Sequence, residues 1–69
     1  MNVMQVKCIS KRGMFPKQIE VNETYYLNPN TIIIDMEGDA YADIYYDNEL
    51  TEVVGTMKLS HFRTVSINY

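Results

Sequence analysis

The sequence predicts a small all-β barrel, and three observations carry this prediction. Several short segments alternate apolar and polar residues with the period of two that is typical of a half-buried strand. Gly, Pro, Asn and Asp separate these segments at intervals of about 8 to 12 residues, as turns would. No segment keeps a helical period over about 11 residues. Together these features favour a five-stranded barrel with one short 3₁₀ turn over any helical fold.

The clearest strand signal is a β-hairpin over residues 31–46. Isoleucines fill its first arm and tyrosines its second, and both residue types suit a pleated surface. Gly38 lies between the arms, where a tight turn requires positive φ. The residues expected to face the core are Ile32, Ile34 and Met36 in the first arm, and Ala40, Ala42, Ile44 and Tyr46 in the second. Asp43 marks the opposite face of the second arm as the wetter one.

Further strands are expected on both sides of the hairpin. They cover residues 2–10 with Met4, Val6 and Cys8 inward, 23–28 with Tyr25 and Leu27 inward, 51–57, and 63–68. Residues 11–22 read as a loop, in which Met14 and Phe15 are expected to fold back over one end of the core.

Local signals predict the remaining connections. Gly55 indicates a bulge or bend within its strand. Asn48 is the residue expected to adopt a left-handed conformation in the turn over 47–50. Residues 58–62 predict a single 3₁₀ turn, because Leu59 and Phe62 are spaced so that both can point inward.

Length and composition restrict the class of protein. The 69 residues predict a single domain over 1–69, and the hydrophobic content of 46% excludes a disordered chain. The single cysteine, Cys8, excludes an internal disulfide and is expected to be a buried thiol, which fits a reducing cytoplasm. The first residues lack the long apolar segment of a signal peptide, and no apolar run approaches the roughly 20 residues of a membrane span.

The charges are segregated along the chain, with a net charge of −3. All nine acidic residues lie between Glu20 and Glu52, and no Lys or Arg falls in that interval. Basic residues concentrate before it, at Lys7, Lys11, Arg12 and Lys17. An acidic middle disfavours nucleic acid across the main sheet, although Lys11, Arg12 and Lys17 remain an alternative phosphate contact.

The order of elements resembles the SH3-like barrel: a strand, a long loop, a three-stranded meander, a 3₁₀ turn and a short closing strand. The segment 54–65 carries most of the likeness, since Gly55 and Phe62 match the Gly–x₆–Phe tail of small bacterial and phage SH3-like proteins. The resemblance implies the fold. It does not imply proline-rich peptide binding, because the chain has no Trp and lacks the ALYDY-type motif of peptide-binding SH3 domains.

Catalytic and metal-binding chemistry is poorly represented. His61 and Cys8 are the only residues of their kinds, and the strand period sends Cys8 into the core, away from any shared cleft. The spacing of Asp35, Glu37 and Asp39 fails the pattern of an EF-hand loop and is typical of a solvated hairpin tip. We therefore expect no enzymatic activity, no bound metal and no cofactor.

The tyrosines predict the functional surface. Tyr41 and Tyr45 share the wetter face of their strand with Asp43, and Tyr26 is expected to join them from the neighbouring strand. Tyrosine is enriched in interfaces because it offers a large rigid area with a polar tip. An aromatic and acidic surface suits a protein partner, so we expect a small adaptor or inhibitor-like module. Self-association through the same face remains an alternative, as does nucleic-acid binding through the basic first loop.

Overall fold

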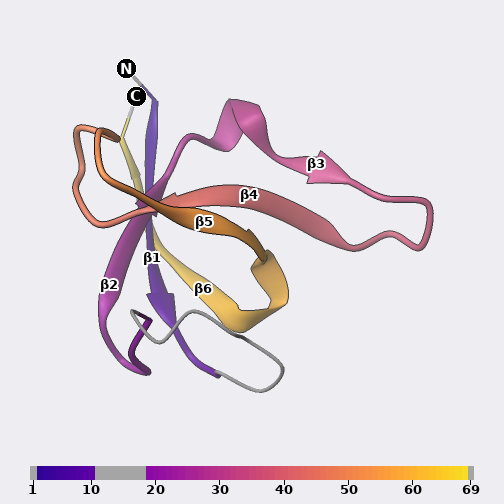
Figure 1. The fold of residues 1–69 in the computed structure, drawn as a ribbon, viewed down its shortest axis with the longest axis horizontal. Coiled ribbons are helices and arrows are strands. Elements are labelled where there is room, and N and C mark those ends of the chain that lie inside the picture. Colours follow the sequence, from indigo (N-terminus) through magenta and orange to yellow (C-terminus); the bar gives the residue numbers. More distant parts are fainter. Residues whose placement is uncertain (1, 11–18, 69) are drawn as a thin grey trace.

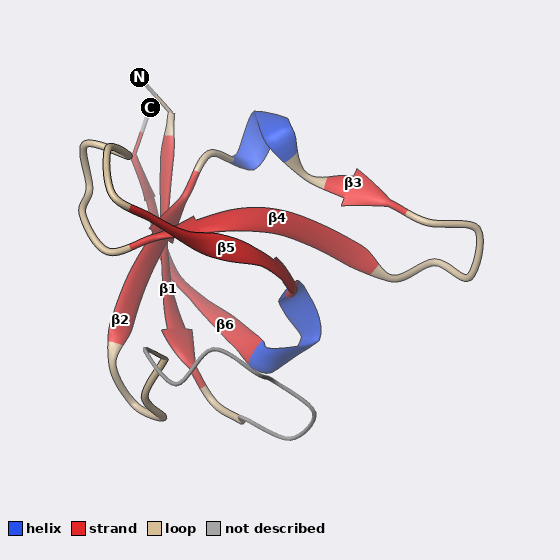
Figure 2. Cartoon of the chain, viewed as in Figure 1, coloured by secondary structure: helices blue, strands red, loops and turns tan. Residues whose placement is uncertain are grey.

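The computed structural model describes residues 2–10 and 19–68, and all of its regular structure is β-strand or 3₁₀ helix. Figures 1 and 2 show the arrangement of these elements. Their bounds are β1 Val3–Cys8, β2 Thr24–Leu27, η1 Pro29–Thr31, β3 Ile33–Ile34, β4 Ala40–Tyr45, β5 Val53–Lys58, η2 Leu59–His61 and β6 Phe62–Asn68. Neither of the described helices is long and apolar enough to cross a membrane.

The strands form one six-stranded antiparallel sheet in the order β3-β4-β2-β1-β6, with β5 added on β4. The prediction of an all-β protein is confirmed. The structure has six strands where a five-stranded barrel was expected, since both arms of the predicted hairpin, β3 and β4, count as strands beside the other four. The sheet is also not closed into a barrel. Among the described strands, β5 pairs only with β4 and β6 only with β1, so these two outer strands are joined through η2 and not by a ladder.

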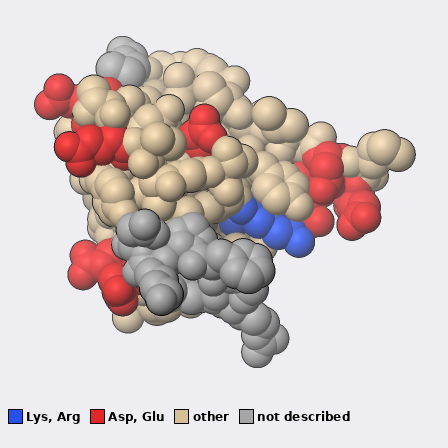
Figure 3. Space-filling view, viewed as in Figure 1, with Lys and Arg blue, Asp and Glu red and all other residues tan. Residues whose placement is uncertain are grey.

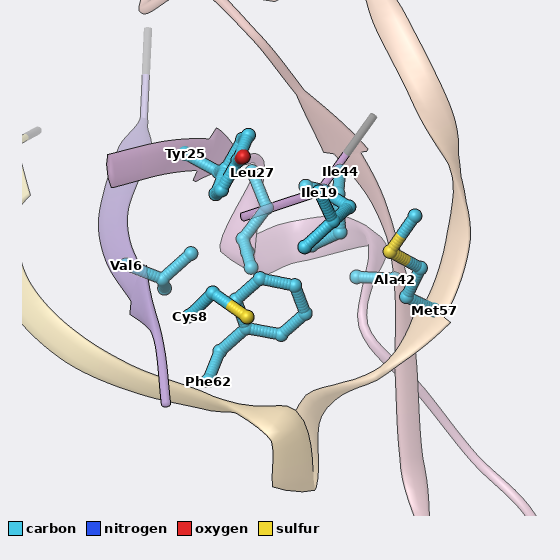
Figure 4. Packing of buried hydrophobic residues seen from close by; sticks show 9 residues of the cluster. All are labelled: Val6, Cys8, Ile19, Tyr25, Leu27, Ala42, Ile44, Met57 and Phe62. Carbon is cyan, nitrogen blue, oxygen red and sulfur yellow. The ribbon is translucent and has the colours of Figure 1, made fainter. Parts of the chain in front are cut away.

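The core lies on the concave side of this sheet. Its buried members are Val6, Cys8, Ile19, Tyr25, Leu27, Ala42, Ile44, Met57 and Phe62, and Figure 4 shows them converging from the surrounding strands. The inward faces predicted for β1, β2 and the end of β4 are thus largely confirmed, and Leu59 packs against the core as expected from its 3₁₀ spacing. Burial of a large aliphatic side chain contributes roughly 1.5–3 kcal/mol.

The hairpin of β3 and β4 departs most from expectation. Its far end projects beyond the rest of the sheet in Figure 1 and has no core to face. Of the residues predicted to point inward from the first arm, Ile32 packs against the core, whereas Ile34 is 67% and Met36 104% exposed. Tyr46 was also predicted to be inward but is 40% exposed, and its ring lies 6.2 Å from that of Tyr25. The alternation predicted the strands but not where the core ends.

The tip of this hairpin is tightly organised despite its exposure. Gly38 has a φ of +89° and donates its backbone N–H to the carbonyl of Asp35 at 3.1 Å. The Asp35 carboxylate accepts the backbone N–H groups of both Glu37 and Asp39 at 2.9 Å. The backbone N–H of Asp35 donates to the carbonyl of Asp39 at 2.9 Å, which closes the loop. The predicted positive φ at Gly38 is confirmed.

The turn between β4 and β5 depends on another aspartate. The carboxylate of Asp47 accepts hydrogen bonds from the hydroxyl and the backbone N–H of Thr51 and from the backbone N–H of Glu52. The left-handed residue is Leu50, with a φ of +59°, and not Asn48 as predicted. The hydrogen bonds to the Asp47 carboxylate set the path of the backbone in this turn. For this reason Leu50, and not Asn48, takes the positive φ, although Asn tolerates such a φ better.

Gly55 marks a β-bulge, as predicted. Ile44 pairs with Gly55 and Tyr45 with Val53, so Val54 is an extra residue in β5. Gly55 has a φ of +156°, which residues with a side chain rarely adopt. The bulge lets Val54 pack against the core while Val53 stays 56% exposed.

Replacement of Gly38 tests the organisation of the hairpin tip. A Cβ at position 38 would meet no atom within 4 Å, so the cost of Gly38→Ala comes from the positive φ alone. We expect a loss of about 1–2 kcal/mol in the free energy of unfolding, measured by urea denaturation, and a smaller loss for Gly38→Asn, since Asn tolerates this conformation. An alanine variant as stable as the wild type would contradict the assigned turn.

The pH dependence of stability tests the Asp47 turn. Hydrogen bonds from the Thr51 hydroxyl, and next from the Glu52 backbone, lower the pKa of Asp47 in the folded state. A lowered folded pKa contributes stability above the pKa of the unfolded chain, and this stability is lost as pH falls through the folded value. Asp47→Asn should therefore lower the free energy of unfolding at neutral pH, and should lower it less in strong acid. Urea denaturation at both pH values measures the difference. Glu49→Gln removes the same charge from this turn, and an equal effect of that control would contradict the assignment.

Candidate functional site

The outer face of β4 holds the three site residues that the sequence predicted there. Tyr41, Asp43 and Tyr45 alternate with the inward residues Ala42 and Ile44, and Asp43 is exposed while both tyrosines are half-buried. Tyr41 and Tyr45 are separated by about 13 Å along the strand, at roughly 3.3 Å per residue. The strand is paired on both edges, so these side chains stand on a rigid backbone.

Neighbouring strands place further side chains beside each of these residues, because register partners share a face. Tyr45 lies opposite Tyr26 of β2, which brings the fourth predicted residue onto the surface. On the other edge of β4, Tyr41 pairs with Lys58, Asp43 with Thr56 and Tyr45 with Val53, while Ile33 of β3 also lies opposite Tyr41. We call the set Tyr26, Ile33, Tyr41, Asp43, Tyr45, Val53, Thr56 and Lys58 the tyrosine face.

Two interactions set the charge of the tyrosine face. The Thr56 hydroxyl donates to the Asp43 carboxylate, which holds that carboxylate against β5. The ammonium of Lys58 lies 3.2 Å from the Asp39 carboxylate, and hydrogen bonding to this partner raises the pKa of Lys58. The charge of Lys58 is therefore balanced by Asp39, which is not a member of the tyrosine face. Asp43 keeps the face acidic near its centre.

Sequence reasoning missed the aliphatic members of the tyrosine face. Ile33 is 68% and Val53 56% exposed, so each leaves a large apolar side chain in solvent beside a tyrosine. In a run of three isoleucines, alternation does not tell which of them face the core. The Gly55 bulge adds one residue to β5, so that Val54 and not Val53 turns toward the core. The bulge signal was visible in the sequence, but which residue it displaces was not.

Basic side chains meet on a different part of the sheet. Lys7 of β1 lies opposite Arg63 of β6, so two cations share the outer face there. Like charges directly opposite one another are destabilising unless something compensates them. The predicted phosphate-contact residues Lys11, Arg12 and Lys17, and the predicted cap residues Met14 and Phe15, lie outside the described residues.

Cys8 and His61 are the residues that the sequence offers for catalysis. Cys8 is fully buried in the core and its thiol donates to the carbonyl of Ser10 at 3.5 Å, while the carbonyl of His61 accepts the backbone N–H of Ile9 at 2.8 Å. Within residues 2–10 and 19–68, no three His, Cys, Asp or Glu side chains are gathered as a metal ion would require. The absence of enzymatic activity stays a prediction.

No family model matches the chain, and neither a curated protein nor a solved structure is found to be similar to it. What the chain does must therefore be argued from its own residues.

A double-mutant cycle on Asp43 and Thr56 tests the geometry of the tyrosine face. Their hydrogen bond crosses from β4 to β5 and should give a coupling energy of about 0.5–1 kcal/mol between Asp43→Ala and Thr56→Ala, measured by urea denaturation. Val65→Ala, on the separate strand β6, provides the control cycle with Asp43→Ala and should be additive. If the effects of Asp43→Ala and Thr56→Ala on the free energy of unfolding were additive, the Asp43 carboxylate would not be bonded to Thr56.

Proposed function

We propose that this protein is a non-enzymatic protein-interaction module, of adaptor or inhibitor-like type, that binds its partner through the tyrosine face. Tyr26, Tyr41 and Tyr45 provide rigid amphipathic contact area, and Asp43 provides charge. The single observation that carries the proposal is the placement of half-buried tyrosines on β4, a strand paired at both edges, beside exposed Ile33 and Val53. Such a mixture of aromatic and aliphatic area is typical of the centre of an interface.

The fold proposal is an open relative of the SH3-like barrel. The pairings give the strand path β5-β4-β2-β1-β6, and the 3₁₀ turn η2 connects the two outer strands. This order supports the resemblance drawn from Gly55 and Phe62, with the difference that hydrogen bonding does not close the sheet. The cytoplasm is the proposed location, since the one thiol is free and buried.

Nucleic-acid binding is the second candidate, and the pairing of Lys7 with Arg63 favours it. Lys7 lies on β1, which precedes Lys11 and Arg12 in the sequence, and Arg63 lies on the neighbouring β6, so these two cations would serve as contacts to a phosphate backbone. The first proposal is preferred because Tyr26, Tyr41 and Tyr45 lie on the tyrosine face beside the negative charge of Asp43. Proteins that stack bases on aromatic platforms surround them with Lys and Arg.

The proposal is tested with the purified wild type and a Tyr41→Ala/Tyr45→Ala variant. A protein captured by the wild type is purified and titrated against both, and we expect the variant to lose at least about tenfold in affinity, or about 1.4 kcal/mol. Val65→Ala removes an exposed aliphatic side chain from β6 and is the matched control, which should bind as the wild type does.

Two outcomes would replace this proposal. In fluorescence anisotropy, sub-micromolar oligonucleotide binding that falls by about 0.7–0.9 log units per log unit of salt for each phosphate contacted would favour the nucleic-acid candidate. Light scattering at two concentrations would reveal a dimer, and its loss in the Tyr41→Ala/Tyr45→Ala variant would assign the tyrosine face to self-association.

A further inference from the structure

The projecting end of the β3–β4 hairpin exposes apolar area that the tyrosine face does not use. Ile34 is 67% exposed and Met36 is fully exposed, and both lie beyond the edge of the core. Ile34 shares a face with Ala40, opposite to the face that carries Ile33 and Tyr41. Isolated exposed hydrophobic residues are common, but adjacent ones on a projecting element are typical of a binding surface.

The same segment is an open sheet edge. β3 is the terminal strand of the sheet order, and within residues 2–10 and 19–68 it pairs with β4 alone, on one of its sides. The backbone N–H of Asp35 donates to Asp39 across the hairpin, and hydrogen-bonded pairs alternate with non-hydrogen-bonded pairs in an antiparallel ladder. The pair of Ile34 with Ala40 is therefore non-hydrogen-bonded, and the N–H and C=O of Ile34 point away from β4.

The charge around this edge selects the occupant. Asp35 and Glu37 flank Met36, and Figure 3 shows acidic side chains gathered at this end of the molecule. Asp39 is compensated by Lys58, which leaves for a partner's cation the charge of Glu37 and that of Asp35, whose Oδ1 already accepts two backbone N–H groups. In an antiparallel pairing of two copies at Ile34, their Asp35 residues would lie about 8 Å apart, within one Debye length, so repulsion disfavours a second copy.

We propose that the open edge of β3 accepts a β-strand of another protein, one that alternates aliphatic residues with Lys or Arg. The added strand exchanges hydrogen bonds with the N–H and C=O of Ile34, its aliphatic residues pack on Ile34 and Met36, and its cations pair with Asp35 and Glu37. The described edge strand has two residues, so the interface is small, as in transient complexes. This site is separate from the tyrosine face and does not depend on the function proposed for it.

The test uses two synthetic peptides, one alternating valine with lysine and one alternating valine with glutamate, in fluorescence anisotropy titrations. The lysine peptide should bind the wild type more weakly as salt rises, and in amide NMR spectra it should shift the Ile34 signal. Ile34→Pro removes the outward N–H without removing a bond to β4, and should weaken binding at least tenfold. Ile34→Val keeps the N–H and is the matched control.

A second variant keeps the test decisive if Ile34→Pro alters the fold by circular dichroism. Glu37→Lys should weaken binding of the lysine peptide and strengthen binding of the glutamate peptide. Unchanged binding to a folded Ile34→Pro variant, or equal binding of both peptides to the wild type, would overturn the proposal. Loss of binding in Tyr45→Ala with retention in Ile34→Pro would assign the peptide to the tyrosine face, and shifts of Ile34 with protein concentration alone would identify a second copy as the occupant.

Discussion

The packing around Tyr25 is the interaction on which the rest of the structure depends. Its ring lies 6.3 Å from that of Phe62 at 81° and 6.2 Å from that of Tyr46, which connects β2 with the start of β6 and the end of β4. Its hydroxyl accepts the backbone N–H of Glu20 at 2.8 Å, which places fully buried Ile19 in the core. Burial raises the pKa of this phenol. A sheet whose outer strands are not hydrogen-bonded to each other must be held by such side-chain contacts.

A core this small also explains the exposed hairpin. The chain has 69 residues, and the described core gathers on one side of a single sheet. Once Ala42 and Ile44 have reached that core, the earlier part of β4 and all of β3 extend past it. The hairpin can persist there because its turn is fixed locally, by Gly38 and by the two backbone N–H groups that Asp35 accepts.

The sequence was informative wherever a local rule decides the structure. Period-two alternation located Val6, Cys8, Tyr25 and Leu27 in the core, and the glycine signals located the Gly38 turn and the Gly55 bulge. It failed where the outcome depends on distant residues. Whether Ile34 and Met36 are buried depends on how far the core extends, and whether the sheet closes depends on the spacing of β5 and β6. The tyrosines of the candidate site were found by alternation, whereas Ile33 and Val53 required the register.

One strand pair presents two independent surfaces because a sheet has a face and an edge. Side chains stand perpendicular to the sheet, so Ile33 extends the tyrosine face beside Tyr41. Backbone groups lie within the plane of the sheet, so the N–H and C=O of the adjacent Ile34 point along the open edge. The two proposed surfaces therefore meet at neighbouring residues without sharing a hydrogen-bonding group. The acidic residues of the hairpin tip lie nearer to the edge, and for this reason the edge, more than the tyrosine face, should discriminate between partners by charge.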